Sequence, residues 1–433
     1  MTKKLTLKTL ALSLSIILLT PFANIAYAKE AATGPEIVSQ AAIVMDYETG
    51  EIIYEKNAND QMFLASTTKL MTALLFAENK SKTDKITYTE TALAQPPYTV
   101  NSEQMLPHGK SMKVGDTLDG DLVMKELLLF SGNDIAYMIA DSVGGNSAGF
   151  IDMMNAKAKE LGLNNTHFEN PNGLPINGTD VNYSTAYELA RLTKLAYENE
   201  WIKETAQLSE ASVVLPGDTR IKVVNRNTEL NKNGNIGGKT GVTDQAGTCF
   251  AGVYERNGRK LVGVVLKCDR NSDSKRFEDL KTMMDYSEAL DRETFKAADE
   301  EVESCELEYK LFKFFGPVKK ITVPVVLAED AKLYNNAINN AEGAIALGNT
   351  TTNAWDAASD NNVTLTLSVK DFNTEVKGTV NITNSQIIQE NTGIYFAVVA
   401  VIVIVLILIG FIVKLLGSLS RQSGNRKNKR RKY

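Results

Sequence analysis

The feature that most constrains this chain is a run of 20 residues, 394–413, without a single charged side chain. It consists of Ile, Val, Leu, Ala, Phe, Tyr and Gly, and a helix of that length crosses the roughly 30 Å hydrocarbon core of a bilayer. The alternative is a buried helix in a soluble core, but core helices seldom run so far without a polar face. The run therefore predicts a single transmembrane helix.

The two ends of the chain predict its orientation in the membrane. Eight lysines and arginines follow the apolar run in residues 414–433, so this tail is expected in the cytoplasm, beside anionic lipid headgroups. Residues 1–28 combine early lysines, a short apolar run and Ala26-Tyr27-Ala28, which is typical of a secretory signal peptide cleaved after Ala28. We therefore expect a single-pass protein of the cell membrane, with the residues between these segments outside the cytoplasm.

The net charge of −5 hides an uneven distribution of charge. Of the 47 basic residues, three lie in residues 1–28 and eight in the tail, which leaves 36 against 52 acidic residues in residues 29–393, a net charge of −16. Phosphate contacts need clustered Lys and Arg, and no such cluster precedes residue 414. We expect no nucleic-acid partner.

Hydrophobic periodicity divides the exported part into two domains. Residues 29–295 have strand-like runs at both ends and helical stretches between them, which predicts an α+β domain. The strand-like runs are 42–46, 51–54, 250–255 and 260–267, and the helical stretches are 68–78, 123–141 and 186–197.

Residues 296–390 are expected to form a small β-rich domain. Apolar and polar positions alternate in four runs: 307–312, 319–326, 363–369 and 375–382. The segment 335–362 is rich in Asn, Ala, Gly and Thr, and we expect it to be an exposed, mobile loop.

Cysteine and histidine are scarce, which narrows the possible chemistry. A turn at Asn257-Gly258 would set Cys249 opposite Leu266 and Cys268 on the diagonal, roughly 7 to 8 Å away and too far for a disulfide, so we favour free cysteines. Only two histidines occur, His108 and His167, and His167 is expected to pack or to make a surface hydrogen bond. A histidine-rich zinc site is nearly excluded, as is a Ser-His-Asp triad unless one of them takes part, and we expect no metal or cofactor.

Ser66-Thr67-Thr68-Lys69 stands directly before an apolar face at helical spacing. Ser66 would therefore begin a buried helix, with Lys69 one turn on, roughly 5 to 6 Å away at the Cβ atoms. A neutral amine there can take the proton of the hydroxyl, although an N-cap serine and a surface lysine would give the same letters. Such a match arises by chance about once or twice in a chain of this length, and Ser272-Asp273-Ser274-Lys275, in a polar segment, is interpreted as accidental.

Two further motifs strengthen the interpretation of Ser66. Ser131-Gly132-Asn133 follows four apolar residues where a buried helix gives way and then resumes, and polar groups in such a place need the partners that a cleft supplies. Lys239-Thr240-Gly241 precedes a strand, where a lysine and a hydroxyl can hold a carboxylate and glycine lets a backbone approach.

Ser-x-x-Lys, Ser-x-Asn and Lys-Thr-Gly, in this order, are the signatures of penicillin-binding proteins and serine β-lactamases. The chain resembles the low-molecular-mass D-alanyl-D-alanine carboxypeptidases over about residues 35–290. The segments that carry the resemblance are 42–50, 65–75, 131–136, 168–174, 183–186 and 238–247. It implies a β-lactamase/transpeptidase-like catalytic domain, an antiparallel sheet with helices, followed by the β-rich domain and the membrane helix.

The resemblance also implies roles for individual residues. The substrate would be a peptidoglycan stem peptide that loses its terminal D-alanine through an acyl-enzyme, and β-lactam antibiotics would acylate the same serine. The roles are Ser66 as nucleophile, Lys69 as base, Ser131 as proton relay, Asn133 on the peptide amide, Lys239 and Thr240 on the terminal carboxylate, and the backbone N–H groups of Ser66 and Val242 as oxyanion hole. Lys239 would also help to keep Lys69 neutral by like-charge repulsion.

Other positions are left open by the resemblance. Arg226 and Arg276 are either further carboxylate ligands or ordinary surface charges. Related sequences often carry histidine where this chain has Asn182.

Other functions remain possible from sequence alone. A class A β-lactamase has a Glu-x-x-Leu-Asn segment between the second and third motifs, a pattern that residues 160–164 match, but Ser359-Asp360-Asn361 comes too late in the chain to serve as its second motif. A D,D-endopeptidase would break the same bond type in a cross-link. A non-enzymatic wall-binding protein could keep the fold, although all six motif side chains are intact.

Overall fold

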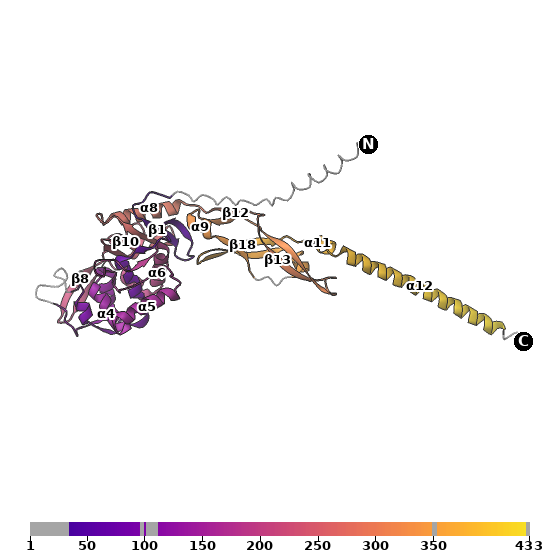
Figure 1. Ribbon diagram of the computed structural model, residues 1–433, viewed down its shortest axis with the longest axis horizontal. Helices are drawn as coiled ribbons and strands as arrows, with labels where there is room; N and C mark the ends of the chain where they lie inside the picture. The colour runs from indigo at the N-terminus through magenta and orange to yellow at the C-terminus, as the bar shows by residue number, and fades with distance from the viewer. Residues whose placement is uncertain (1–33, 96–98, 101–110, 349–352, 430–433) are drawn as a thin grey trace, which may run out of the picture.

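The computed structural model describes residues 34–95, 99–100, 111–348 and 353–429. Figure 1 shows three parts in a row, a mixed helical and sheet part, a β-rich part and one long helix. This arrangement confirms the expected α+β class with a β-rich part and an apolar C-terminal helix. The expected signal peptide, residues 1–28, lies outside the described residues, as do tail residues 430–433 and His108.

The first part is built on a five-stranded antiparallel sheet with strand order β2-β1-β11-β10-β9. Its strands are β1 (Ala41–Asp46), β2 (Ile52–Lys56), β9 (Asn235–Thr243), β10 (Gly247–Arg256) and β11 (Arg259–Cys268). In β1, Ile43 and Met45 join one hydrophobic cluster and Ala42 and Val44 join another. Alternate residues of a strand point to opposite faces, so the unbroken apolar run of β1 reflects a sheet covered on both faces.

Helices cover both faces of this sheet. On one face lies α8 (Lys275–Ala289), which packs through Phe277, Leu280 and Met284. On the other face lie α6 and the helices around it. They are α1 (Lys69–Asn79), α2 (Glu90–Leu93), α3 (Gly120–Lys125), α4 (Asn133–Gly144), α5 (Ser147–Glu160), α6 (Ala186–Glu198) and α7 (Glu200–Ala206).

Short strand pairs complete this part of the molecule. They are β3 (Met62–Phe63) with β6 (Tyr183–Ser184), β4 (Lys85–Thr87) with β5 (Thr117–Asp119), and β7 (Glu210–Leu215) with β8 (Thr219–Val224). Cys249, Cys268 and Cys305 are free, as expected. A bulge pairs Thr248 with Cys268, so the register near Cys249 departs from a regular hairpin.

The second part is a five-stranded antiparallel sheet with order β13-β14-β18-β17-β16. The strands are β13 (Glu301–Lys310), β14 (Val318–Leu327), β16 (Ala344–Leu347), β17 (Asn362–Val369) and β18 (Phe372–Val380), next to a small pair, β12 (Glu293–Lys296) and β15 (Ala331–Leu333). Leu365, Leu367 and Val369 of β17 are buried while the residues between them are less so, which is the alternation that the sequence predicted.

The expectation of an exposed loop at 335–362 is wrong for the described residues. The segment contains α9 (Ala337–Glu342), β16 and α10 (Ala354–Ala357), and Ile338 and Trp355 are buried in the core. Asn336 and Asn353 cap the two short helices with their side chains. The asparagine side chains thus accept hydrogen bonds from the free backbone N–H groups at the helix ends. The segment has few large apolar residues, and Trp355 is the largest apolar side chain that it buries.

A single helix, α12 (Thr392–Lys429), leaves the β-rich part after α11 (Asn384–Gln389). Residues Thr392–Leu419 are long and apolar enough to cross a membrane, and none of the apolar window is buried. Large side chains such as Phe396, Leu406 and Phe411 are exposed. A soluble-core helix would bury these side chains, so that alternative does not hold.

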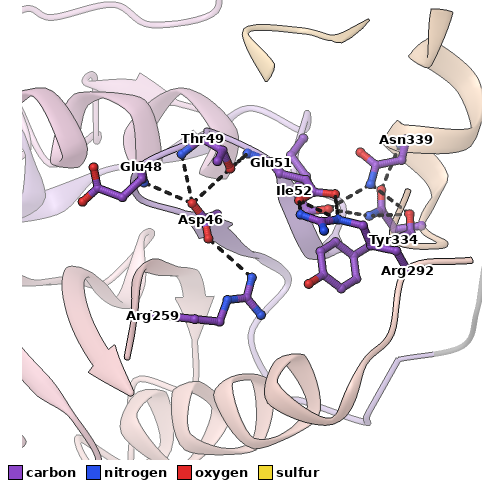
Figure 2. A network of polar contacts seen from close by, with 10 residues as sticks. Asp46, Glu48, Thr49, Glu51, Ile52, Arg259, Arg292, Tyr334 and Asn339 are labelled. Atoms are coloured by element: carbon purple, nitrogen blue, oxygen red, sulfur yellow. Dashed lines mark hydrogen bonds and ion pairs between the residues drawn. The ribbon is translucent and has the colours of Figure 1, made fainter. Parts of the chain in front are cut away.

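Buried polar contacts join β2 to the β-rich part (Figure 2). The Glu51 carboxylate, 1% exposed, accepts hydrogen bonds from Arg292 Nε at 2.9 Å and Nη2 at 2.6 Å. The carbonyl oxygen of Ile52 accepts from Asn336 Nδ2 at 3.0 Å and from Asn339 Nδ2 at 2.9 Å. Glu51, Asn336 and Asn339 are buried, although the Arg292 side chain is half exposed, so the contacts fix the β-rich part against the edge of the first sheet.

Replacing Arg292 should therefore destabilise the protein more than replacing Arg259, because its partner Glu51 is 1% exposed whereas Asp46, the partner of Arg259, is 16% exposed. Arg292→Met leaves Glu51 buried without its cation, and we expect a loss of about 2 kcal/mol in unfolding free energy. Arg259→Met breaks the longer ion pair with Asp46, at 3.4 Å, and should cost less than about 0.5 kcal/mol. Thermal unfolding of the detergent-solubilised chain compares the two, and equal shifts would contradict the role given to Glu51.

Candidate active site

A pocket of about 280 Å³ lies between β9, the turn before α1 and the start of α4. Five of the seven site residues predicted from the sequence line this pocket. The other two, Lys69 and Lys239, are buried behind it: the Lys69 amine lies within hydrogen-bond distance of Ser66, and the Lys239 amine within hydrogen-bond distance of Thr240. The lining is Ser66, Ser131, Asn133, Leu174, Arg226, Thr228, Thr240, Gly241, Val242, Asp273 and Arg276. The structure thus brings together segments that are far apart in the chain.

Ser66 lies in a single 3₁₀ turn, Ala65–Thr68, rather than in the first turn of α1 as the sequence suggested. Ala65 has a φ of 46°, in the left-handed region that costs a non-glycine residue about 1 kcal/mol. This tight turn leaves Ser66 partly exposed while its neighbours Ala65 and Thr67 are buried. A Cβ atom on Gly241 would lie 3.0 Å from the backbone nitrogen of Ser66, so glycine is what allows β9 to pass this closely.

The Lys69 amine has three oxygen neighbours from three segments of the chain. Its Nζ lies 3.0 Å from Ser66 Oγ, 2.8 Å from Asn133 Oδ1 and 2.7 Å from the carbonyl oxygen of Asn172. The amide and carbonyl oxygens only accept hydrogen bonds, so they take two N–H groups. A neutral amine then has its lone pair directed at Ser66, whose O–H donates to it. This is the geometry of a general base on a nucleophile.

The electrostatics favour that neutral form. Burial is the largest cause that lowers the pKa of Lys69 well below its ordinary value, and the positive charge of Arg226 lowers it further. Asp134 acts in the opposite direction, and burial raises its own pKa to about 6. Arg226 is thus a cation near Lys69 that the sequence did not indicate, in addition to Lys239, whose own pKa the charge of Lys69 lowers.

Lys239 and Lys69 repel each other when both are charged. Burial lowers its pKa well below the ordinary value, and Lys69, Arg226 and Arg276 lower it further. Its Nζ donates to the carbonyl oxygen of Thr240 at 2.9 Å. Three or more cations crowded around one pocket make it a site for an anion.

Ser131 stands where the helix breaks. A π-helical turn, Glu126–Phe130, ends at Ser131, which has φ 71° and ψ 35°, and α4 begins two residues later. Its Oγ is buried and has no hydrogen-bond partner among the residues that the structure describes. A buried hydroxyl without a partner costs roughly 1 to 3 kcal/mol, so its place at the pocket wall fits a group that meets substrate.

The two arginines left open by the sequence both line the pocket. Arg276 is 3% exposed, donates from Nη1 to the Gly241 carbonyl at 3.4 Å and pairs with Asp273 at 2.8 Å. Arg226 lies over the ring of Phe130, 4.9 Å from its centre. Neither is an ordinary surface charge. In the second Ser-x-x-Lys match, the Ser272 hydroxyl contacts the exposed Ser274 hydroxyl. Asp273 of the same segment lines the pocket, where it pairs with Arg276.

The turn after Phe168 contributes to the site through residues for which the sequence predicts no role. Asn172 contributes its carbonyl to Lys69, and Asn182 Nδ2 donates to Thr68 Oγ1 at 3.1 Å and to the Asn170 carbonyl at 2.9 Å. Asn182 thus ties this turn to the end of the Ser66 turn. Asn170-Pro171-Asn172-Gly173 has the composition of a turn, and that was the only local signal. His167 lies at the surface with Nε2 2.5 Å from Glu169 Oε1.

Comparison with known proteins identifies similar sequences. The sequence profile of the D-alanyl-D-alanine carboxypeptidase family, peptidase S11, matches residues 28–270. The D-alanyl-D-alanine carboxypeptidase DacF of Bacillus subtilis is 33% identical over 263 residues, 59% of this chain and 64% of the relative. The chain therefore spans somewhat less than two thirds of that relative.

Solved structures agree in fold. The DD-transpeptidase of Streptomyces K15 is 30% identical with a TM-score of 0.53, and the match covers 60% of this chain and all of that one. Penicillin-binding protein D2 of Listeria monocytogenes, solved in a cefotaxime-bound form, is 30% identical with a TM-score of 0.51, over 59% of this chain and 99% of that one. The matched part corresponds in extent to the first part of this structure.

Alanine substitutions at two glycines test how closely the turn at Gly173 packs on the Ser66 turn. Gly173 and Gly178 both have positive φ, 80° and 78°, so alanine strains both backbones equally. A Cβ on Gly173 would lie 1.8 Å from the Ala65 carbonyl oxygen, whereas nothing lies within 4 Å of one on Gly178. We expect Gly173→Ala to lower the unfolding free energy by roughly 2 kcal/mol more than Gly178→Ala does. Equal effects in thermal unfolding would show that the packing of this turn on Ala65 is loose.

Proposed function

The chain belongs to the D-alanyl-D-alanine carboxypeptidase family, peptidase S11, and on this premise we propose that it is a serine-type D-Ala-D-Ala carboxypeptidase. Its substrate is the stem peptide of peptidoglycan, from which it removes the terminal D-alanine. The observation that carries the proposal is the contact of the buried Lys69 amine with Ser66 Oγ at 3.0 Å. The other two neighbours of that amine are pure acceptors, so once burial has made the amine neutral its lone pair is left for the hydroxyl.

The reaction follows from these contacts. Lys69 Nζ takes the proton of Ser66, and Oγ attacks the carbonyl carbon between the last two D-alanines. The oxyanion that forms accepts hydrogen bonds from the backbone N–H groups of Ser66 and Val242. When the C–N bond breaks, Ser131 passes a proton to the leaving amine of D-alanine, and Asn133 holds the peptide amide. Water then hydrolyses the ester on Ser66 and restores the free hydroxyl.

The cations around the pocket bind the terminal carboxylate of the substrate. Lys239 and Thr240 are the first ligands, and Arg276 and Arg226 line the same pocket. A carboxylate beside Lys239 raises its pKa and restores its positive charge. That charge then opposes protonation of Lys69, so the substrate itself helps to keep the base neutral.

The same site can serve related reactions, because the acyl-enzyme can react with water or with an amine. The names of the similar proteins include both a carboxypeptidase and a transpeptidase. Endopeptidase action on cross-links stays an alternative. β-Lactamase action is less supported, because the Glu-x-x-Leu-Asn pattern of class A enzymes at residues 160–164 puts Glu160 at the exposed end of α5, where it pairs with Lys157 at 3.0 Å and does not line the pocket. A β-lactam enters as a substrate mimic that acylates Ser66 and leaves slowly.

We infer that the apolar C-terminal helix anchors this chemistry at the outer face of the cell membrane. The exposed apolar helix Thr392–Leu419 serves as the anchor, with residues 394–413 in the bilayer and the basic residues of 414–433 in the cytoplasm. After removal of residues 1–28, residues 29–295 form the catalytic domain and 296–390 a β-rich stalk that faces the cell wall.

Labelled penicillin tests the nucleophile. We expect the full chain in detergent to form a covalent, gel-stable adduct, and Ser66→Ala to lose more than about 99% of it, because the Ser66 hydroxyl is the one that lies 3.0 Å from the buried Lys69 amine among the residues that the structure describes. Ser272→Ala, in the second Ser-x-x-Lys match, is the matched control and should label like the wild type. A wild type that fails to label would refute the proposed mechanism.

The pH dependence of labelling tests the base. Lys69 must be neutral to accept the proton, so the acylation rate should fall as pH drops through its lowered pKa. Arg226→Gln removes a cation that lowers this pKa, so the midpoint should move to higher pH. Lys69→Arg should abolish labelling, because arginine stays charged. Labelling retained in Lys69→Arg, or a midpoint in Arg226→Gln that moves to lower pH, would rule out this role of the amine.

A further inference from the structure

The turn between β13 and β14 carries an unusual exposed surface. Residues 313–318, the last five of the turn and the first of β14, are all exposed, and their sequence is Lys-Phe-Phe-Gly-Pro-Val. Phe314 is 78% exposed and Phe315 is 66% exposed. Two adjacent phenylalanines with so much free surface at the tip of a hairpin indicate a surface that is covered when the protein is in place.

The position of this turn relative to α12 follows from two sets of contacts. Asn391, just before the helix, contacts the hairpin at Tyr309 and Lys319, with Asn391 Nδ2 donating to Tyr309 Oη at 2.7 Å and Lys319 Nζ donating to Asn391 Oδ1 at 2.8 Å. Tyr395, one helical turn later, donates from Oη to the Leu311 carbonyl at 2.5 Å.

The two sets of contacts come in the same order along both elements. From 391 to 395 the helix advances about 6 Å, and from 309 to 311 the strand advances about 7 Å. The hairpin and the helix therefore run in the same direction, as Figure 1 also shows. Residues 313–318 lie beyond these contacts, so the turn reaches the level at which the apolar stretch of α12 begins.

The charges around the turn fit a lipid surface. Residues 309–328 contain four lysines and no acidic residue. Lys313 lies over the ring of Phe314, and the stacked rings of Phe312 and Phe315 continue to Tyr395, which lies 5.6 Å from Phe312. Aromatic rings with flanking lysines are the side chains that occupy the boundary between headgroups and acyl chains.

We propose that the β13–β14 turn inserts Phe314 and Phe315 into the boundary region of the leaflet through which α12 enters, with Lys313 at the lipid phosphates. This inference rests on the membrane anchor proposed above and is independent of the hydrolase chemistry. The bilayer then holds the β-rich part at two points, the helix and the turn. A helix alone would let this part pivot, whereas two points fix the direction in which the catalytic part stands away from the membrane.

Depth-dependent quenching tests the insertion in the full chain. Three variants are compared: Phe314→Trp, Phe411→Trp and Leu93→Trp. Each is reconstituted into vesicles of phosphatidylcholine and phosphatidylglycerol, with or without bromine on the acyl chains. The fluorescence of the wild-type protein, which comes from buried Trp201 and Trp355, is subtracted. Leu93 is 51% exposed on α2, far from the membrane, and Phe411 reports on the span itself. Brominated lipid should reduce the emission of Phe314→Trp and Phe411→Trp by about twofold or more and leave Leu93→Trp unchanged.

The remaining outcomes distinguish a failure of the proposed insertion from a failure of the proposed anchor. Quenching of Phe411→Trp without quenching of Phe314→Trp would overturn the insertion and leave the anchor standing. Unquenched but blue-shifted emission from Phe314→Trp would mean that protein, for example a second copy of the chain, covers the turn, and would equally overturn it. Lack of quenching at both positions would overturn the anchor and the insertion together.

Discussion

The buried amine of Lys69 is the constraint on which the rest of the site depends. A lysine without access to water is tolerated only as a neutral base or with full compensation, and here two oxygen acceptors from Asn133 and Asn172 hold its N–H groups. Holding three segments around one nitrogen requires the strained turn at Ala65, the helix break at Ser131 and the tight turn at Gly173. Backbone strain of this kind, stored beside reactive groups and compensated by the surrounding core, is expected where geometry matters more than local stability.

Much of this could be predicted from the sequence because it is encoded locally. Ser66 and Lys69 share one helical turn, the interruption at Ser131 breaks a visible apolar pattern, and the alternation in β17 marks a half-buried strand. Other features depend on groups that only the fold brings together. Nothing near Lys69 in the chain indicates that the Asn172 carbonyl accepts a hydrogen bond from its amine, or that Arg226 is a cation that lowers its pKa. The prediction of an exposed loop at 335–362 is wrong because it relies on the polar composition of the segment. Trp355 and two asparagine caps are enough to give this segment an ordered structure.

The three parts of the molecule are connected by contacts of different kinds. The Glu51–Arg292 pair and the two asparagines on Ile52 join the catalytic part to the β-rich part through shielded polar groups. Asn391 and Tyr395 join the β-rich part to the membrane helix. With the turn at Phe314 in the lipid boundary, as proposed, these contacts would form one continuous support from the bilayer to the pocket. The proposed action on the cell wall, a fixed polymer, needs a site at a defined height, which such a support would supply.

The most direct measurement of the central claim uses a soluble stem pentapeptide that ends in D-Ala-D-Ala, incubated with the purified full chain and followed by mass spectrometry. If the buried Lys69 amine activates Ser66 as described, the peptide loses one alanine residue and an equal amount of free D-alanine appears, while the Ser66→Ala protein leaves the peptide intact. If the wild-type protein releases no D-alanine, or if Ser66→Ala releases it at the same rate, the account of this site is wrong.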